Sequence, residues 1–189
     1  MVLLSGKGER EAELCEGIVI NSGLDYTIVR ASWFSQNFSE SFFLEPILHG
    51  VVALPLADTN VPYVDADDIA EVAVEALLNQ THNGEIYELT GSQFFTFRQV
   101  IAEISKAIGR EIAFIEVSVD EYTQTLKEHG VPAGYVWLIG YLFTEVLDNE
   151  ANQVMTHDIE KVLGRKPRLF LDFVKKTAVT GIWNQKVEV

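Results

Sequence analysis

One segment of the sequence, residues 30–38, contains the residue types best suited to holding a small molecule. Trp33 and Phe34 offer flat apolar walls, and Asn37 offers an amide that donates and accepts hydrogen bonds. The segment directly follows residues 26–29, whose β-branched and aromatic side chains predict a parallel strand. Ligands of open α/β sheets bind at the carboxyl ends of such strands. The segment therefore indicates a small-molecule pocket; the alternative is that Trp33 and Phe34 fill core space and Asn37 caps a turn.

Motifs of the common nucleotide-binding and hydrolytic enzymes are missing from the sequence. Gly6-Lys7-Gly8 begins like the dinucleotide fingerprint G-x-G-x-x-G, but Glu11 stands at its third glycine position. There is no G-x-x-x-x-G-K loop, no Tyr-x-x-x-Lys pair and no G-x-S-x-G elbow. The catalytic residues therefore stay unknown. The phenol of Tyr63 is considered as a general acid at a pocket rim, although a half-buried strand aromatic is the favoured interpretation.

The metal-binding residue types do not form a recognisable site. The histidines lie far apart, and none is four residues from another. Asp65, Asp67 and Asp68 could form a cation site, but an acid-rich first turn of a helix is favoured because it requires only the helix dipole. Cys15 is expected to be a small core residue rather than a nucleophile. No metal is predicted.

Composition narrows the class of protein. The 189 residues carry a net charge of −14, which disfavours nucleic acids and anionic membranes as partners. The apolar fraction of 48% is that of a globular core, and the length favours one domain. The N-terminal residues carry no basic region, so we expect no signal peptide. Since a single cysteine cannot form an internal disulfide, a cytoplasmic location is expected.

Alternating strand and helix signals predict the elements that position these residues. A strand, a helix and a second strand within the first thirty residues form a βαβ unit, which favours an α/β fold. The expected strands cover residues 2–4, 26–29, 51–54, 86–89 and 112–117. The expected helices cover residues 9–20, 32–38, 66–78, 96–108, 119–129, 133–147, 158–163 and 169–180. The back of the chain is therefore richer in helix than the front.

Several short motifs follow one another in a characteristic order and spacing. They are LLSG (3–6), GLDYTIVR (23–30), WF (33–34), QNF (36–38), PYVDADDIA (62–70), YELTG (87–91), TF (96–97) and LGRKP (163–167). Through these motifs the sequence resembles the NmrA-like branch of the atypical short-chain dehydrogenase/reductase superfamily. Residues 170–183 are similar to the C-terminal stretch of bacterial members grouped with the festuclavine dehydrogenases.

The resemblance implies a particular part of that fold. It places the chain as the C-terminal portion of a Rossmann-like doubly wound parallel sheet with a small helical substrate-side appendage. Residues 1–189 are then a single domain, in which residues 1–90 form the partial sheet and residues 91–189 the mostly helical part. The N-terminal part with the Gly-rich turn is not matched. The resemblance leaves open a truncated gene, a partial chain or a natural short paralogue.

The resemblance also implies site residues and a cofactor. Ser5 and Gly6 would end the strand beside the nicotinamide ribose of NAD(P), with Ala31 and Ser32 also binding the cofactor. The substrate pocket would contain Trp33, Phe34, Asn37 and Tyr63. Because the Gly-rich turn supplies the donors that hold the pyrophosphate, NAD(P) binding by this chain is expected to be weak or absent.

Three functions remain open from the sequence. The leading one is an NAD(P)H-dependent oxidoreductase, whole or truncated, that acts on a small organic substrate. The others are a non-catalytic dinucleotide-sensing or protein-interaction module and a cofactor-free remnant. In each case residues 2–4 would form an unpaired apolar edge strand, which invites pairing with a second chain. We therefore expect a homo-oligomer.

Overall fold

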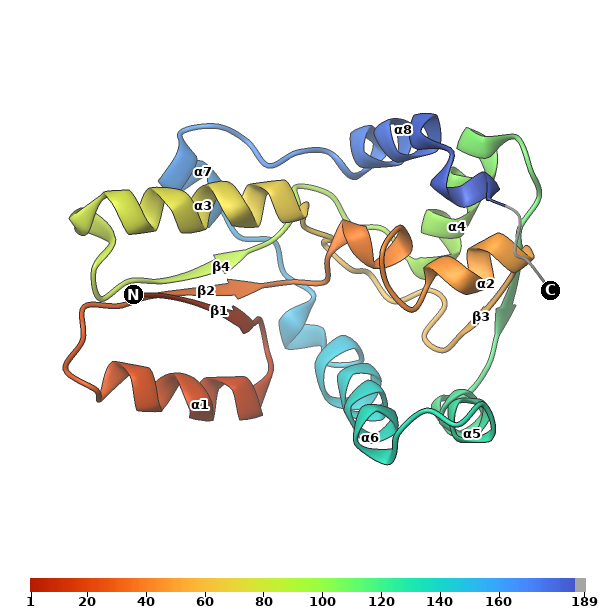
Figure 1. Cartoon of the computed structure of the whole chain (residues 1–189), viewed down its shortest axis with the longest axis horizontal. Coiled ribbons are helices and arrows are strands. Elements are labelled where there is room, and N and C mark those ends of the chain that lie inside the picture. The colour runs from red at the N-terminus through yellow and green to blue at the C-terminus, as the bar shows by residue number, and fades with distance from the viewer. Residues whose placement is uncertain (186–189) are drawn as a thin grey trace. The chain divides into compact units, whose positions relative to one another are not determined.

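The structure, a computed structural model, describes residues 1–185 and divides into two compact units (Figure 1). Unit 1 consists of Met1–Ser35, Pro62–Phe94 and Val154–Phe170. Unit 2 consists of Gln36–Val61, Phe95–Gln153 and the described residues from Leu171 onward. Each unit is thus assembled from three separate stretches of chain. The single domain expected over residues 1–189, with its division at residue 90, stays a prediction.

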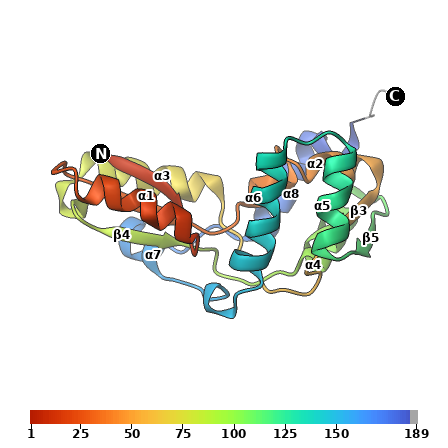
Figure 2. The same cartoon turned by 90° about the horizontal axis from the view of Figure 1, so that it is seen from below.

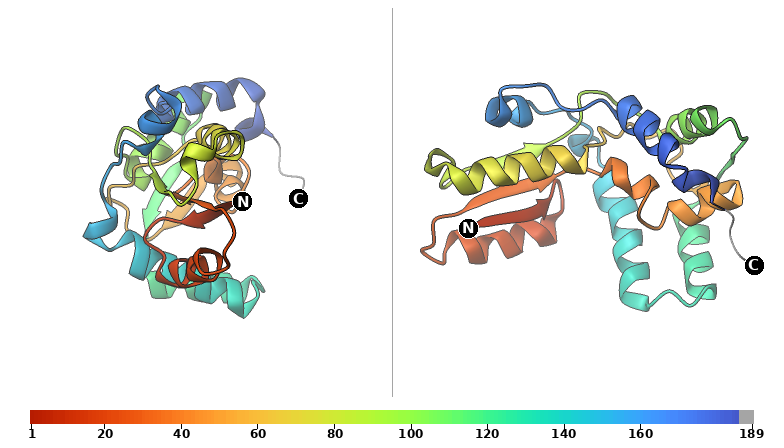
Figure 3. Two further views of the ribbon diagram at one scale, coloured as in Figure 1. Left: turned by 90° about the vertical axis from the view of Figure 1, so that its left-hand side faces the viewer. Right: turned by 45° about the horizontal axis from the view of Figure 1, so that its top comes forward.

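Unit 1 is built on a three-stranded parallel sheet. Its strands are β1 (Val2–Gly6), β2 (Thr27–Ala31) and β4 (Ile86–Leu89), in the order β1-β2-β4. Helix α1 (Arg10–Ile20) covers one face of the sheet and α3 (Ala66–Leu78) covers the other (Figures 1 and 3). Parallel strands with helices on both faces confirm the α/β class predicted from the alternating signals.

The core of unit 1 lies between α3 and the sheet. Asp65 caps α3 by accepting a hydrogen bond from the Asp67 N–H at 2.9 Å. The helical spacing that follows turns Ile69 and Val72 toward the sheet, where both are buried. Helix α7 (Asp158–Leu163) contacts α3 and β4 and adds Ile159 to this core.

Asp68, in the first turn of α3, is completely buried and held by two arginines. Its carboxylate accepts hydrogen bonds from Arg165 Nη2 and from the Arg168 backbone N–H, both at 2.7 Å, and from Arg168 Nη1. Both arginines also bind Glu71. These hydrogen bonds, chiefly that from Arg168, lower the pKa of Glu71 to about 2. The acid-rich first turn is confirmed, and it ties α3 to a distant part of the chain.

Unit 2 contains a two-stranded parallel sheet of β3 (Val51–Leu54) and β5 (Ala113–Glu116). Its helices are α2 (Leu44–His49), α4 (Phe97–Ile108), α5 (Val119–Glu128), α6 (Ala133–Tyr141) and α8 (Phe170–Thr180). A π-helix over Leu142–Leu147 continues α6. Helices α5 and α6 contact each other and form a hairpin, which Figure 2 shows side by side.

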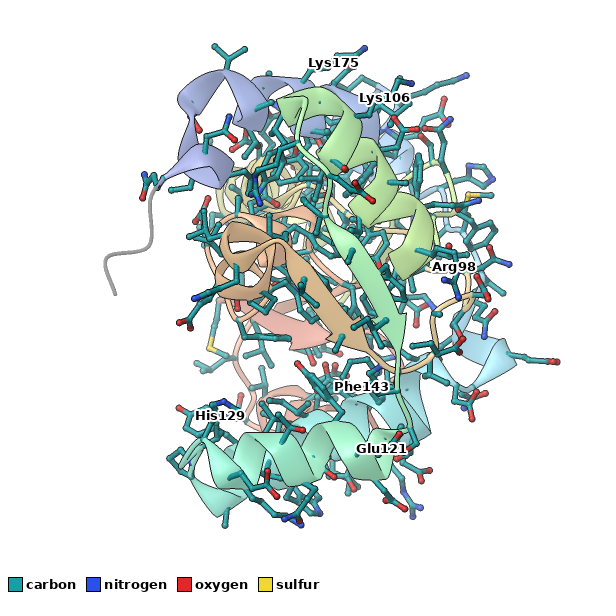
Figure 4. The ribbon with its side chains drawn as sticks, turned by 90° about the vertical axis from the view of Figure 1, so that its right-hand side faces the viewer. Arg98, Lys106, Glu121, His129, Phe143 and Lys175 are labelled. Carbon is teal, nitrogen blue, oxygen red and sulfur yellow. The ribbon has the colours of Figure 1, made fainter. Side chains whose placement is uncertain are left out.

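The core of unit 2 is a row of aromatic rings. Phe38 stacks on Phe43 with ring centroids 5.1 Å apart, and Phe43 meets Phe97 edge-on at 5.7 Å. Phe97 in turn lies 6.0 Å from Phe143, which Figure 4 labels on the side of α5 nearest the two-stranded sheet. The Trp183 indole N–H donates to the backbone carbonyl oxygen of Phe38 at 2.7 Å. All five side chains are buried, so this core is apolar throughout.

Two sequence predictions of burial are wrong. Cys15 is exposed on α1 rather than packed in a core, because the helix turns the neighbouring Glu16 inward instead. Leu4, expected in a buried strand, is about half exposed, because β1 is the edge strand of its sheet. A parallel strand is therefore correct at this place, but its complete burial is not.

Most expected elements are found within a few residues of their predicted bounds, and three differ. Phe34 forms a parallel bridge with Val64, so only Ser35–Phe38 of the helix expected over residues 32–38 forms, as a 3-10 helix. Helix α2 was not expected, because Pro46 reads as a breaker. Pro46 lies in the first turn, where its missing N–H has no helical partner to lose. The helix expected over residues 133–147 changes to a π-helix after Tyr141.

Further 3-10 helices cover Gln80–His82 in unit 1 and Glu150–Asn152 and Ile182–Asn184 in unit 2. Within residues 1–185, none of the helices combines the length and the apolar character needed to cross a membrane.

Candidate functional site

The carboxyl ends of β1, β2 and β4 meet at one edge of unit 1. In the sheet register Gly6 lies opposite Ala31, and Ala31 lies opposite Leu89. Just beyond the strands, the Lys7 N–H donates to the Ala31 carbonyl at 3.0 Å and the Ser32 N–H to the Leu89 carbonyl at 2.9 Å. The four residues predicted to bind a cofactor therefore lie together here: Ser5, Gly6, Ala31 and Ser32. We call this edge the strand-end site.

Trp33 and Phe34 continue from β2 at the strand-end site. The Val64 N–H donates to the Trp33 carbonyl at 2.9 Å, and the Ser35 N–H donates to the Val64 carbonyl at 2.8 Å. These bonds fix the segment against the residues that precede α3. Trp33 and Phe34 are both half-buried, and Phe34 packs against the core of unit 1. This fits either a pocket wall or a partly covered core edge.

Tyr63 lies where the backbone around residue 62 closely approaches the backbone at Gly91. The Gly91 N–H donates to the Pro62 carbonyl at 3.1 Å, and a Cβ at Gly91 would stand 2.1 Å from the Tyr63 carbonyl oxygen, so only glycine fits. Tyr63 is fully buried rather than half-buried, with its ring 5.5 Å from that of Phe170. Burial raises the pKa of its phenol well above the ordinary value, so Tyr63 is protonated at neutral pH.

Asn37 is the one predicted site residue that belongs to unit 2. It is half-buried in the 3-10 helix Ser35–Phe38. The structure therefore places the other predicted residues in unit 1 and describes Asn37 separately. The roles assigned to all of them stay predictions.

A buried ion pair between Glu16 and Arg30 adjoins the strand-end site through Ser5. Glu16 of α1 is 1% exposed and accepts hydrogen bonds from Arg30 Nη2 at 2.7 Å and from the Ser5 hydroxyl at 2.6 Å. Burial by itself would raise the pKa of Glu16, but the hydrogen bonds from Arg30 and Ser5 and the charge of Arg30 outweigh it and hold the pKa below its ordinary value. Arg30 also approaches Glu13 at 3.3 Å and Glu88 at 3.4 Å. The hydroxyl of Ser5 is thus engaged by α1.

Sequence reasoning missed two charged residues at the strand-end site. Lys7 is only 7% exposed, and its Nζ lies 3.8 Å from Glu88 Oε2. The Glu9 carboxylate folds against Gly6, where an added Cβ would stand 1.9 Å from Glu9 Oε1. Burial, and secondarily Glu11, raise the pKa of Glu9. The sequence shows only that Lys7 and Glu9 flank Gly8 just after an apolar strand, and their approach to Glu88 and Gly6 arises from the tertiary structure.

The strand-end site offers chemistry suited to the nicotinamide end of a dinucleotide. Gly6 has no side chain, and the Glu9 carboxylate lies in the space where a Cβ would stand. That carboxylate can accept a hydrogen bond from a ribose hydroxyl, and Lys7 supplies a nearby positive charge. The residues present therefore fit the nicotinamide ribose, while the sequence provides no Gly-rich turn for the pyrophosphate. When bound, NAD(P)H supplies the hydride of a reduction.

The sequence profile of the NmrA-like family matches residues 14–179. The chain belongs to this family. It is 30% identical over 162 residues to prestalk A differentiation protein A of Dictyostelium discoideum, covering 86% of this chain and 54% of that protein. It is 29% identical over 172 residues to an NAD(P)H azoreductase of Xenophilus azovorans, covering 90% and 57%. The chain thus spans about half the length of the curated relatives it matches.

Among solved structures, the chain is similar to the NADPH complex of quinone oxidoreductase 2 from Escherichia coli. The TM-score is 0.77 at 23% identity, over 93% of this chain and 64% of the other. At that identity the likeness shows the fold alone. It confirms the Rossmann-like class that the sequence motifs implied.

Proposed function

We propose that this chain forms the substrate-side part of an NAD(P)H-dependent oxidoreductase that acts on a small organic molecule. The observation that carries the proposal is the strand-end site. There the Glu9 carboxylate lies over Gly6, and Glu9 and Lys7 provide hydrogen-bonding and charged groups at the carboxyl ends of parallel strands. Relatives named as an NAD(P)H azoreductase and a quinone oxidoreductase support an oxidoreductase role.

In this proposal the residues divide into two groups. Gly6, Ala31 and Ser32 bind the nicotinamide ribose, and Ser5 supports them through its bond to Glu16. The substrate lies against Trp33 and Phe34, and Tyr63 belongs to the same pocket of unit 1. Because Tyr63 is buried and protonated, its part in this pocket is packing or hydrogen-bond donation rather than exchange of its proton with solvent. Reduction then depends on the placement of cofactor against substrate.

The names of two relatives suggest the substrate class. Azo compounds and quinones are both conjugated electron acceptors. We therefore propose a conjugated acceptor that takes up a hydride and a proton.

A second candidate is a dinucleotide-sensing or protein-interaction module that performs no reduction. The absent glycine fingerprint limits affinity: we expect Kd values for NAD(P)H no tighter than about millimolar, because the backbone donors for the pyrophosphate are not supplied. A test must therefore detect weak binding and turnover separately.

Nuclear magnetic resonance with reduced nicotinamide mononucleotide provides that test, because this probe lacks the adenine half. We expect saturable amide shifts at Gly6, Ala31 and Ser32 at concentrations up to about 10 mM. Gly6→Ala should weaken them, since the new methyl group would fill the space beside the strand end and displace the Glu9 carboxylate. Gly17→Ala is the matched control, because nothing lies within 4 Å of the Cβ it would add.

The outcomes separate the candidates. Oxidation of the probe in the presence of a water-soluble quinone supports the oxidoreductase, and binding without oxidation supports the sensing module. No shifts at the strand-end site, or shifts that Gly6→Ala leaves unchanged, would remove the proposed cofactor site.

We also propose that the chain forms a homo-oligomer through β1, and that it is located in the cytoplasm. Among the described strands β1 pairs with β2 alone, and the adjoining helix α1 leaves Leu14 and Ile18 exposed. Light scattering of the protein at a concentration on the order of tens of micromolar should give twice the monomer mass. A stable monomer would contradict this.

The exposed thiol of Cys15, the only cysteine, is compatible with a reducing location.

A further inference from the structure

The α5–α6 hairpin of unit 2 is firmly anchored on one side. The ring of Tyr122 on α5 meets Phe143 edge-on at 5.6 Å, and burial raises the pKa of Tyr122 to about 12. Val136 of α6 is buried as well. The two helices are in ordinary contact near Gly140, where an added Cβ would stand 3.5 Å from Thr123 Cγ2. The hairpin is therefore held to the aromatic core, and its geometry does not depend on a ligand.

Between the two helices lies a groove of about 500 Å³, which we call the hairpin groove. Thr123 and Lys127 of α5 and Val136, Trp137, Gly140 and Tyr141 of α6 are among its lining residues. This volume falls within the range of sites that bind drug-sized molecules. Its walls combine apolar and aromatic side chains with charged and hydroxyl groups.

An aromatic pair forms part of the wall of the hairpin groove. The rings of Trp137 and Tyr141 are stacked with centroids 5.5 Å apart and an angle of 10° between their planes. Trp137 is nevertheless 61% exposed. A large parallel ring pair that is left accessible can accept a further flat ring by stacking. Aliphatic ligands would gain nothing specific from this geometry.

The charges around the groove favour a positive ligand. Asp120 and Glu145 line it together with one basic residue, Lys127. The whole chain carries a charge of −14, which attracts cations and repels anions at long range. The face of an indole ring is itself the best aromatic partner for a cation. Ring stacking and charge therefore select the same kind of ligand.

We propose that the hairpin groove binds a planar aromatic cation, which stacks on the Trp137–Tyr141 pair and is held by the carboxylates of Asp120 and Glu145. This site lies entirely within unit 2 and requires no dinucleotide. It therefore stands or fails independently of the cofactor site proposed in unit 1.

The probe for the test is proflavine, a flat three-ring cation whose own fluorescence reports binding. Titration at about 0.15 M salt suppresses adsorption driven by net charge alone. We expect saturable binding to the full chain, with one site per chain. Anthraquinone-2-sulfonate, a flat anion, and tetramethylammonium, a cation without rings, should bind at least about tenfold more weakly.

Trp137→Leu should weaken proflavine binding about tenfold or more, because it keeps an apolar side chain but removes the ring face. Tyr135→Leu is the matched control: Tyr135 is on the same helix and 63% exposed, yet does not line the groove. Glu145→Gln should weaken proflavine binding several-fold without changing the affinity for a neutral flat ring. Because these side chains are exposed, thermal melting should be unchanged in each variant.

Equal loss of affinity in Trp137→Leu and Tyr135→Leu would overturn the proposal, as would anthraquinone-2-sulfonate binding as tightly as proflavine. Proflavine that splits a dimer in light scattering would show instead that a second copy occupies the groove.

Discussion

The two units stabilise their cores with different kinds of contact. Unit 1 buries carboxylates: Glu16 is held by Arg30, and Asp68 is held by Arg165 and Arg168. Unit 2 instead has a row of aromatic rings that ends at Trp183, whose one polar atom bonds to the backbone. The candidate cofactor residues lie in the unit with buried charges, and the hairpin groove lies in the unit with the rings.

The difference teaches how each unit responds to change. A buried carboxylate depends on its partner, and its cost when unpaired depends on pH. A buried ring contributes by the apolar area it removes from water, which pH does not alter. Substitutions in the two units should therefore lower the free energy of unfolding by similar amounts, but the losses should depend on pH in unit 1 and not in unit 2.

The largest effect is expected for Trp183→Ala in unit 2. Removing this fully buried indole leaves a cavity beside Phe38 and Phe173, and we expect a loss of about 4 kcal/mol in the free energy of unfolding. The loss should be the same at pH 5 and pH 8. Urea denaturation followed by circular dichroism measures it, and a loss that varies strongly with pH would contradict the apolar character of this core.

Arg30→Met should rank second, with a loss of about 3 kcal/mol at neutral pH because it leaves Glu16 buried and charged. In the wild type the lowered pKa of Glu16 contributes stability above its unfolded pKa. In the variant burial raises that pKa, so the difference between the two proteins should shrink as pH falls. Arg98→Met is the control: its pairs with Asp58 and Glu116 are exposed, and little should change. A loss independent of pH would mean that Arg30 acts by packing.

Thr96→Ala should cost about 1 kcal/mol, since Thr96 and Gln99 form a capping box at the start of α4. The control is Thr125→Ala in α5, whose hydroxyl bonds only to the carbonyl of Glu121 within the same helix. Thermal melting of both variants decides this. Equal melting temperatures would show that the cap contributes nothing.

The smallest effect should come from Glu71, which is nearly half exposed. Its folded pKa of about 2 lies below the ordinary value of 4.5, so its contribution is present above pH 4.5 and is lost as pH falls toward 2. Acid titration of the wild type and Glu71→Gln should therefore converge at the acid end. Curves that stay parallel throughout would show that the Glu71 pairs are screened by solvent.

The sequence predicted the elements of both units well, because their signals are local. The N-cap Asp65 and the capping box of Thr96 and Gln99 are patterns of neighbouring residues, and the apolar spacing of α3 correctly buries Ile69, Val72 and Ala76 although Leu77 is exposed. Cys15 was misplaced because helical periodicity does not show that a charged neighbour, Glu16, faces inward to meet Arg30. That pairing depends on a contact between α1 and β2, which no local pattern encodes.

The candidate site was predictable in part for the same reason. The family resemblance implied Gly6, Ala31 and Ser32, and these residues lie together because the carboxyl ends of parallel strands share one edge. Glu9 was missed because its role arises from folding back over Gly6, which only the tertiary structure reveals. The complete burial of Tyr63 likewise follows from the approach of Gly91 and the ring of Phe170.

The assembly of each unit from three stretches of chain has a consequence for biosynthesis. Asp68 and Arg168 are 100 residues apart. At a translation rate of roughly 5–20 residues per second, Arg168 is synthesised on the order of 5–20 seconds after Asp68. During that interval unit 1 has its sheet but not the stretch Val154–Phe170 that completes it. During this interval the chain should be most exposed to chaperones and proteases. A translational pause after residue 170 would come too late to change the length of that interval.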